Sequence, residues 1–116
     1  MIADPSHGAS APGNLEIQLK RDAQGTVLAL AGELDLASVP ELDRQLQALE
    51  GSIPGRRLLI DLGGLDFIDS TGLASMIRAQ QSAHANGHRL ALRRGQAQVQ
   101  RLFELTGLID RFTFEE

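Results

Sequence analysis

The sequence predicts a single α/β domain, in which an N-terminal β-hairpin is followed by alternating helices and strands, with a small, mostly parallel sheet flanked by helices. Apolar and polar residues alternate over residues 15–20, and an apolar run over residues 26–32 follows a short turn, which is typical of a hairpin. Helical and extended patterns then alternate to the end of the chain, which favours a parallel sheet. The length of 116 residues suits one domain with one core.

The start of the domain is set by a change in composition. Residues 1–13 are rich in Gly, Ala, Ser and Pro and show no periodicity, so they are predicted to form a flexible arm. The domain is expected over residues 14–116. Within its hairpin, "RDAQG" at residues 21–25 supplies the Asp and Gly that are typical of a turn.

The first predicted helix covers residues 37–50 and ends before the breakers of residues 51–55. Ser38 is expected to cap its N-terminus, and Glu41, three residues later, to complete a capping box. The spacing of its leucines places them on one apolar face. These leucines are Leu42, Leu46 and Leu49.

A buried central strand is predicted over residues 56–62, because a short apolar run between breakers is typical of parallel sheets. A loop is expected over residues 63–70, and the second helix from Ser70 to about Ala85, where "NG" at 86–87 stops it. The apolar face of this helix is expected to carry Leu73, Met76, Ile77, Gln80 and Ala83. The other side is expected to carry Gly72, Ser75, Arg78 and Ala79.

The remaining elements are a strand over residues 88–94, a helix over residues 96–107 capped by Gly107, and a short terminal strand over residues 108–114. In parallel sheets, functional sites lie beyond the carboxyl ends of the strands. The loop that leaves the central strand, residues 63–72, is therefore the expected place of function.

The composition argues against several classes of protein. The chain has no cysteine, which excludes disulfides and thiol chemistry, and its net charge of −4 makes it a poor generic binder of nucleic acid. No apolar run approaches the ~18 residues of a membrane span, and the N-terminus lacks the pattern of a secretory signal. We expect no membrane insertion and a cytoplasmic location.

Catalysis at Ser70 has little support. A serine nucleophile needs a base within reach, and His84 and His88 lie about 20 Å away along the helix axis. These two histidines lack an evident third metal ligand. A phospho-aspartate receiver needs a lysine near its last strand and a P-loop needs one too, whereas no lysine follows Lys20. We expect no enzyme activity, no cofactor and no bound metal.

Two interpretations of residues 69–71 remain open. Asp, Ser and Thr are all common at helix starts, so these residues can act simply as caps. Alternatively, Ser70 can accept a phosphate, whose charge is tolerated by the exposed N–H groups and the dipole of the helix. A phosphate there would disrupt an apolar or acidic interface without unfolding the domain.

Three stretches match parts of a known family in the right order. They are "LAGELDLASVPEL" at residues 30–42, "LLIDLGGLDFIDSTGLASM" at residues 58–76 and "VQRLFELTGLIDRF" at residues 99–112. They look like the G-E-L-D stretch, the D-S-[ST]-G segment and the third helix of the STAS domain of bacterial anti-sigma factor antagonists. The resemblance covers about residues 14–114 and implies a single STAS domain.

The resemblance implies a phosphoprotein that regulates transcription by partner switching and is not itself an enzyme. In the family, the unphosphorylated antagonist binds an anti-sigma factor, which is a serine kinase with a histidine-kinase-like ATPase fold, and so frees the sigma factor. The kinase phosphorylates the serine that follows the motif aspartate, here Ser70, and this releases the antagonist. A metal-dependent serine phosphatase restores it. Thr71 stands where the sporulation regulator has a second serine, which is a mild departure.

The binding surface that the resemblance implies comprises residues 67–72, the exposed side of the following helix and the turn over residues 33–38. Asp35 is expected to meet an arginine of the kinase. Gly72, which has no side chain, is expected to allow close approach of a partner backbone. The candidate partner-binding residues are Glu33, Asp35, Ser38, Phe67, Asp69, Thr71, Gly72 and Ser75.

Three alternatives share the fold. A STAS module with a non-sigma output, such as secretion or motility, carries the same motif. A STAS subunit of a lipid or anion transport system often lacks a phosphorylatable serine, whereas Ser70 is present here. A sensor of small molecules or nucleotides would bind its ligand in a pocket.

Overall fold

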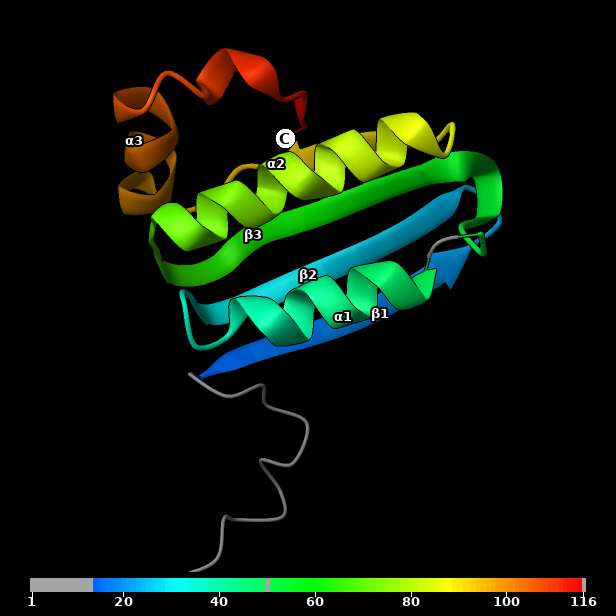
Figure 1. Cartoon of the computed structure of the whole chain (residues 1–116), viewed down its shortest axis with the longest axis horizontal. Helices are drawn as coiled ribbons and strands as arrows, with labels where there is room; N and C mark the ends of the chain where they lie inside the picture. The colour runs from blue at the N-terminus through cyan, green and yellow to red at the C-terminus, as the bar shows by residue number, and fades with distance from the viewer. Residues whose placement is uncertain (1–13, 50, 116) are drawn as a thin grey trace, which may run out of the picture.

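The computed structural model describes residues 14–49 and 51–115. They form a five-stranded sheet in the order β1-β2-β3-β4-β5, with α1 and α2 lying against the same face (Figure 1). The arm predicted over residues 1–13 lies outside the described residues. The strands are β1 (Leu15–Asp22), β2 (Gly25–Leu34), β3 (Arg57–Ile68), β4 (Arg89–Arg93) and β5 (Phe114–Glu115).

The predicted α/β class and the mostly parallel sheet are confirmed. β1 and β2 are antiparallel, whereas each later neighbouring pair is parallel. The hairpin turn is shorter than the predicted residues 21–25, because β1 continues to Asp22. Oδ1 of Asp22 accepts hydrogen bonds from the backbone nitrogens of Gln24 (2.7 Å) and Gly25 (3.1 Å). A side chain therefore closes this two-residue turn.

β3 corrects one sequence prediction. In place of a loop over residues 63–70, the strand continues to Ile68 and its far end pairs with β2. The pairing register shifts in this part of the ladder. Gly64 allows the close approach, since a Cβ there would lie 2.8 Å from the carbonyl oxygen of Leu30. The glycines thus mark an irregularity within a long strand and not its end.

Three helices follow β2, β3 and β4, and two short 3₁₀ turns, η2 and η3, complete the elements. α2 has the predicted bounds, whereas α1 and α3 are each shorter than predicted. The helices are α1 (Val39–Leu49), α2 (Ser70–Ala85) and α3 (Ala97–Leu105), and the 3₁₀ turns are η2 (Pro54–Arg56) and η3 (Ile109–Arg111).

The capping box predicted for α1 is not formed. The carboxylate of Glu41 accepts hydrogen bonds from the side chains of Arg44 and Gln45, and it does not turn back to Ser38. The guanidinium of Arg44, followed by the amide of Gln45, lowers the pKa of Glu41 to about 2. The carboxylate of Glu41 therefore forms an ion pair with Arg44, three residues later in the helix, instead of capping the helix N-terminus.

The end of the chain also differs from the prediction of one strand over residues 108–114. η3 occupies the middle of that range, and only the two residues of β5 pair with β4. Phe112 and Phe114 instead make edge-to-face contacts with Phe103 of α3, with ring centroids 5.6 and 5.4 Å apart. Phe112 and Phe114 both keep extended backbone, so the packing of the three aromatic rings holds the end of the chain but does not account for η3.

The core lies between the helices and one face of the sheet. Leu28 and Ile60 are fully buried on that face, and Leu73 and Met76 of α2 pack into the same cluster. The other side of α2 was expected to face away from the core, but Gly72, Ser75 and Ala79 are buried as well. Ser75 lies against Asp43 of α1, whereas Gly72 lies against the ends of β2 and β3, and a single-helix pattern reveals neither neighbour.

Candidate functional site

α2 begins at the edge of the sheet where β2 and β3 end (Figure 1). In the parallel ladder Glu33 lies beside Phe67, and the backbone nitrogen of Asp69 donates to the carbonyl oxygen of Leu34 at 3.2 Å. The two segments that the sequence singled out, residues 33–38 and 67–72, are therefore neighbours. Their position at the carboxyl ends of parallel strands is the expected place for a site.

Asp69 is the N-cap of α2. Its Oδ1 accepts hydrogen bonds from the backbone nitrogen of Gly72 at 2.9 Å and from the hydroxyl of Thr71 at 2.5 Å. Its Oδ2 accepts one from the backbone nitrogen of Leu36 at 3.3 Å. One carboxylate therefore caps the helix and also joins it to the turn that follows β2.

The hydrogen bonds of Asp69 change its acidity. Its partial burial raises the pKa, but the bonds from Thr71, Gly72 and Leu36 together outweigh burial and lower the pKa below its ordinary value of 3.8. Asp69 is therefore ionised at neutral pH, and its negative charge lies at the positive end of the helix dipole.

Ser70 differs from both of its neighbours. Its side chain is exposed, and its hydroxyl makes no hydrogen bond to any residue in the described part of the chain. The hydroxyl of Thr71 is instead engaged with Asp69, and its side chain is half-buried. The capping role that the sequence left open for residues 69–71 thus belongs to Asp69, and Ser70 presents an uncommitted hydroxyl.

The turn over residues 33–38 is held by Asp35 and Ser38. Oδ1 of Asp35 accepts from the backbone nitrogens of Ala37 (3.1 Å) and Ser38 (3.2 Å), and the hydroxyl of Ser38 donates to the carbonyl oxygen of Glu33 at 2.8 Å. The side chain of Ser38 is fully buried. Ser38 was expected to contact a partner, but its place is inside the turn, where it shapes the backbone.

Gly72 and Ser75 also lie inside the molecule. A Cβ on Gly72 would lie 2.7 Å from the carbonyl oxygen of Leu34 and 2.7 Å from Cγ1 of Ile68. The close approach that glycine allows is therefore between α2 and the sheet, and not with a partner backbone as expected. Ser75 is fully buried and donates a hydrogen bond to Asp43 of α1.

The exposed surface around Ser70 is apolar and acidic. Leu36, at the tip of the turn, is 73% exposed, and Phe67, at the end of β3, is 48% exposed. Glu33 and Asp35 lie on the same edge and are partly exposed. Sequence reasoning found Phe67 but missed Leu36, although its position in a turn that begins at Asp35 and ends at Ser38 was a signal that it could not reach the core.

Among the described residues, neither histidine lies within reach of Ser70. His84 lies at the far end of α2, about 20 Å away along the helix axis, and His88 lies beyond it. Within residues 14–49 and 51–115, no group of three or more His, Cys, Asp or Glu side chains is placed to hold a metal ion. None of the helices in this part of the chain is long and apolar enough to cross a membrane.

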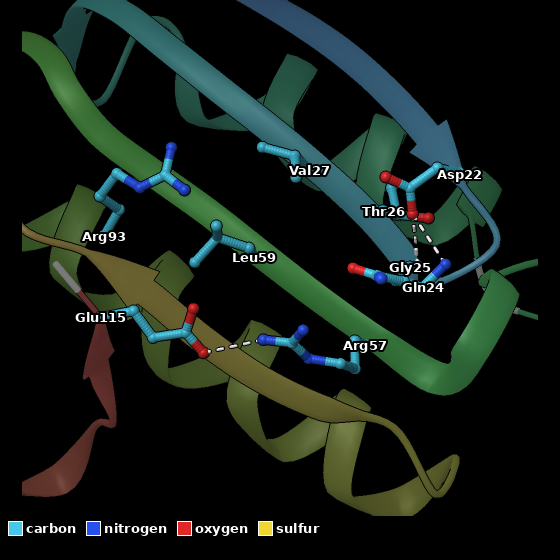
Figure 2. Close-up of a pocket in the computed structure, with 9 residues that line it drawn as sticks. All are labelled: Asp22, Gln24, Gly25, Thr26, Val27, Arg57, Leu59, Arg93 and Glu115. Carbon is cyan, nitrogen blue, oxygen red and sulfur yellow. Dashed lines mark hydrogen bonds and ion pairs between the residues drawn. The ribbon is translucent and has the colours of Figure 1, made fainter.

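A hollow lies on the helix-free face of the sheet, near the starts of β2 and β3 (Figure 2). Val27 and Leu59 form its floor, and an ion pair of 3.0 Å joins Arg57 to Glu115 across it. None of the residues that line it was predicted as a site residue. It lies at the edge of the sheet opposite to Ser70, since parallel strands begin at one edge and end at the other.

The amino-acid sequence matches the family model described as "Mlab, STAS domain" over residues 17–113. The anti-sigma-B factor antagonist of Listeria monocytogenes is 34% identical over 98 residues, which cover 84% of this chain and 85% of that relative. The chain belongs to the STAS domain family. Its described residues include the G-E-L-D and D-S-[ST]-G segments, and the structure brings these two segments together at one edge.

Solved structures of STAS domains share this fold. An anti-sigma factor antagonist from Mycobacterium paratuberculosis matches with a TM-score of 0.77 at 24% identity, covering 90% of this chain and 88% of that chain. The unphosphorylated antagonist SpoIIAA matches with a TM-score of 0.72 at 21% identity, covering 86% and 88%. Its phosphorylated form, from Bacillus, matches at 0.66 and 20% identity, covering 86% and 91%.

Proposed function

We propose that this STAS domain is an anti-sigma factor antagonist that works as a phosphorylation-controlled partner switch, with Ser70 as the acceptor of phosphate. The unphosphorylated chain binds an anti-sigma factor through the β2–β3 edge and so frees the sigma factor. The relative from Listeria monocytogenes bears the name anti-sigma-B factor antagonist, and SpoIIAA has a phosphorylated form. The partner is a serine kinase with a histidine-kinase-like ATPase fold, and a metal-dependent serine phosphatase reverses the reaction.

The observation that supports this proposal is that Asp69 and Ser70 have different roles at the start of α2. Asp69 caps α2, so the exposed hydroxyl of Ser70 is free to react without loss of the cap. In the transfer, Oγ of Ser70 bonds to the γ-phosphorus of ATP held by the kinase. The bond from that phosphorus to the β–γ bridging oxygen breaks, ADP leaves, and the hydroxyl proton passes to a base of the kinase.

The added phosphate acts on the interface and not on the fold. It brings about −1.5 to −2 charges to a helix N-terminus, where the dipole tolerates them. The same charge lies next to Asp69 and on the surface that carries Leu36 and Phe67. Burying a phosphate against a partner there requires its dehydration and sets it against a carboxylate, so phosphorylation releases the partner.

Phosphate transfer to purified protein tests the proposal. The full chain is incubated with ATP and a panel of purified anti-sigma factor kinases, beginning with the anti-sigma-B factor implied by the name of the Listeria relative. Intact-protein mass spectrometry should show one added phosphate in the wild type and none in Ser70→Ala. Ser52→Ala is the matched control, because Ser52 is also an exposed serine but lies beyond the end of α1.

Two results would overturn the proposal. A phosphate that persists in Ser70→Ala would place the acceptor elsewhere. Absence of both binding and phosphate transfer with every kinase of the panel would remove the anti-sigma factor as the partner. Titration calorimetry with the same kinases should also show that Ser70→Glu binds at least about 10-fold more weakly than the wild type.

A further inference from the structure

The exposed apolar side chains gather near Ser70. In the described part of the chain, four large apolar side chains are exposed, and two of them, Leu36 and Phe67, lie on the edge where β2 and β3 end. Single exposed leucines are common on protein surfaces and do not by themselves indicate a binding site. Two large apolar side chains on adjacent strand ends, next to an uncommitted serine hydroxyl, form a patch that a partner can cover.

Leu36 is held in its exposed position. Its backbone nitrogen donates to Oδ2 of Asp69, and the turn around it is closed by bonds to Asp35 and Ser38 on either side. The backbone therefore cannot easily relax to fold the side chain back onto the core. A side chain that is fixed before binding loses little conformational freedom on docking, which favours affinity.

The two chain segments that carry Leu36 and Phe67 contain acidic residues and no basic ones. Carboxylates come from Glu33, Asp35 and Asp69, and no lysine or arginine occurs in residues 33–43 or 58–77. A surface of complementary chemistry has an apolar pocket with arginine or lysine side chains on its border. An acidic or wholly polar surface would leave Leu36 uncovered and the carboxylates unpaired.

We propose that Leu36 is an apolar anchor of this STAS domain, and that Asp69 is the positioning residue that holds it out for docking. The occupant is a pocket of the anti-sigma factor that is apolar at its centre and basic at its border. The identity of this partner rests on the proposed function. The role of Asp69 does not, because it concerns the turn of the free protein.

The variant Asp69→Asn separates the two roles of the Asp69 carboxylate, which caps α2 and also accepts the hydrogen bond from Leu36. Asparagine caps helices about as well as aspartate, so its oxygen can keep the bonds from Gly72 and Thr71. Its amide group then faces the Leu36 nitrogen, where a donor meets a donor and the bond is lost. Amide hydrogen exchange by NMR should show exchange at Leu36 faster by about 10-fold, with α2 protected as in the wild type.

Binding tests the anchor. The kinase of the panel that binds the wild type should bind Leu36→Ala more weakly by at least about 30-fold, the loss typical of a buried hot spot. Leu105→Ala is the matched control, because Leu105 is 71% exposed but lies at the end of α3. Its affinity should equal that of the wild type. Asp69→Asn should bind more weakly by about 5- to 10-fold, since the anchor is present but no longer held.

The binding and exchange experiments test separate parts of this proposal. Equal affinity of Leu36→Ala and the wild type would overturn the anchor. Unchanged exchange at Leu36 in Asp69→Asn would overturn the positioning role, whatever the binding result. If no kinase binds the wild type, the proposed function fails and its docking pocket with it, while the exchange experiment still decides whether Asp69 holds Leu36.

Discussion

The hydroxyl of Ser75 donates a 2.7 Å hydrogen bond to Oδ1 of Asp43, and this bond joins α2 to α1 inside the molecule. The other oxygen of Asp43 accepts a bond of 2.7 Å from Arg78, which is half-exposed. Both helices begin at the edge that carries Ser70 (Figure 1). Their spacing therefore influences how the turn after β2 sits against the start of α2.

Ser75→Ala should destabilise the fold by about 0.5–1.5 kcal/mol, because it removes the hydrogen bond between the buried hydroxyl of Ser75 and the partly exposed carboxylate of Asp43. Urea unfolding followed by far-UV circular dichroism measures the loss. Arg78→Ala serves as the comparison and should cost less than about 1 kcal/mol, since its ion pair is exposed. A larger loss in Arg78→Ala than in Ser75→Ala would show that the buried bond is not the main link.

Gly72→Ala should destabilise the fold by about 1–3 kcal/mol through overpacking. The new methyl group would lie 2.7 Å from both a backbone oxygen and a side-chain carbon of the strands. Ala74→Gly probes the same helix turn without adding volume, and its cost should stay near 1 kcal/mol. The midpoint of urea unfolding checks both variants. Wild-type stability of Gly72→Ala would mean that α2 can move away from the sheet without cost.

Acid should weaken the fold partly through Asp69. Because its folded pKa lies below its ordinary value of 3.8, the ionised carboxylate stabilises the fold above about pH 4, and this contribution is lost as the pH falls through the folded pKa. Asp69→Asn should therefore lose less stability than the wild type between about pH 6 and about pH 3. Urea midpoints at the two pH values measure this, and equal losses would contradict the role of Asp69. Glu41, whose pKa of about 2 is shifted in the same direction, accounts for part of the loss that remains.

A negative charge at Ser70 should leave the fold intact. Ser70→Glu places a carboxylate at the first position of α2, where the helix dipole favours it by about 0.3–1 kcal/mol. Ser70→Lys carries the opposite charge and should be destabilised by a similar amount. Thermal unfolding of both variants checks the sign. If Ser70→Glu unfolded more readily than Ser70→Lys, phosphorylation at this position would act by disrupting the fold.

The sequence predicted the start of α2 at Ser70 and its end near Ala85 because its signals agree: an Asp-Ser-Thr start, a helical apolar pattern and an Asn-Gly stop. It failed at residues 63–68, where two glycines looked like a loop. One of them, Gly64, allows a close approach to Leu30 of β2, and that contact depends on a strand more than 30 residues earlier in the chain. The prediction of a capping box at Glu41 was wrong for a related reason. The carboxylate of Glu41 had two competing partners, the N-terminus of α1 at Ser38 and the side chain of Arg44, and the capping-box motif takes account only of the first.

The sequence by itself determined the α/β class, the order of the elements and the segment around Ser70, because periodicity, turn residues and family motifs are local features of the chain. Only the tertiary structure decided which residues of that segment are available. It buried Ser38, Gly72 and Ser75, since α1, α2 and the ends of the strands pack together there. It also gave Asp69 a second role besides the cap, because the bond between Asp69 and Leu36 joins residues 33 positions apart.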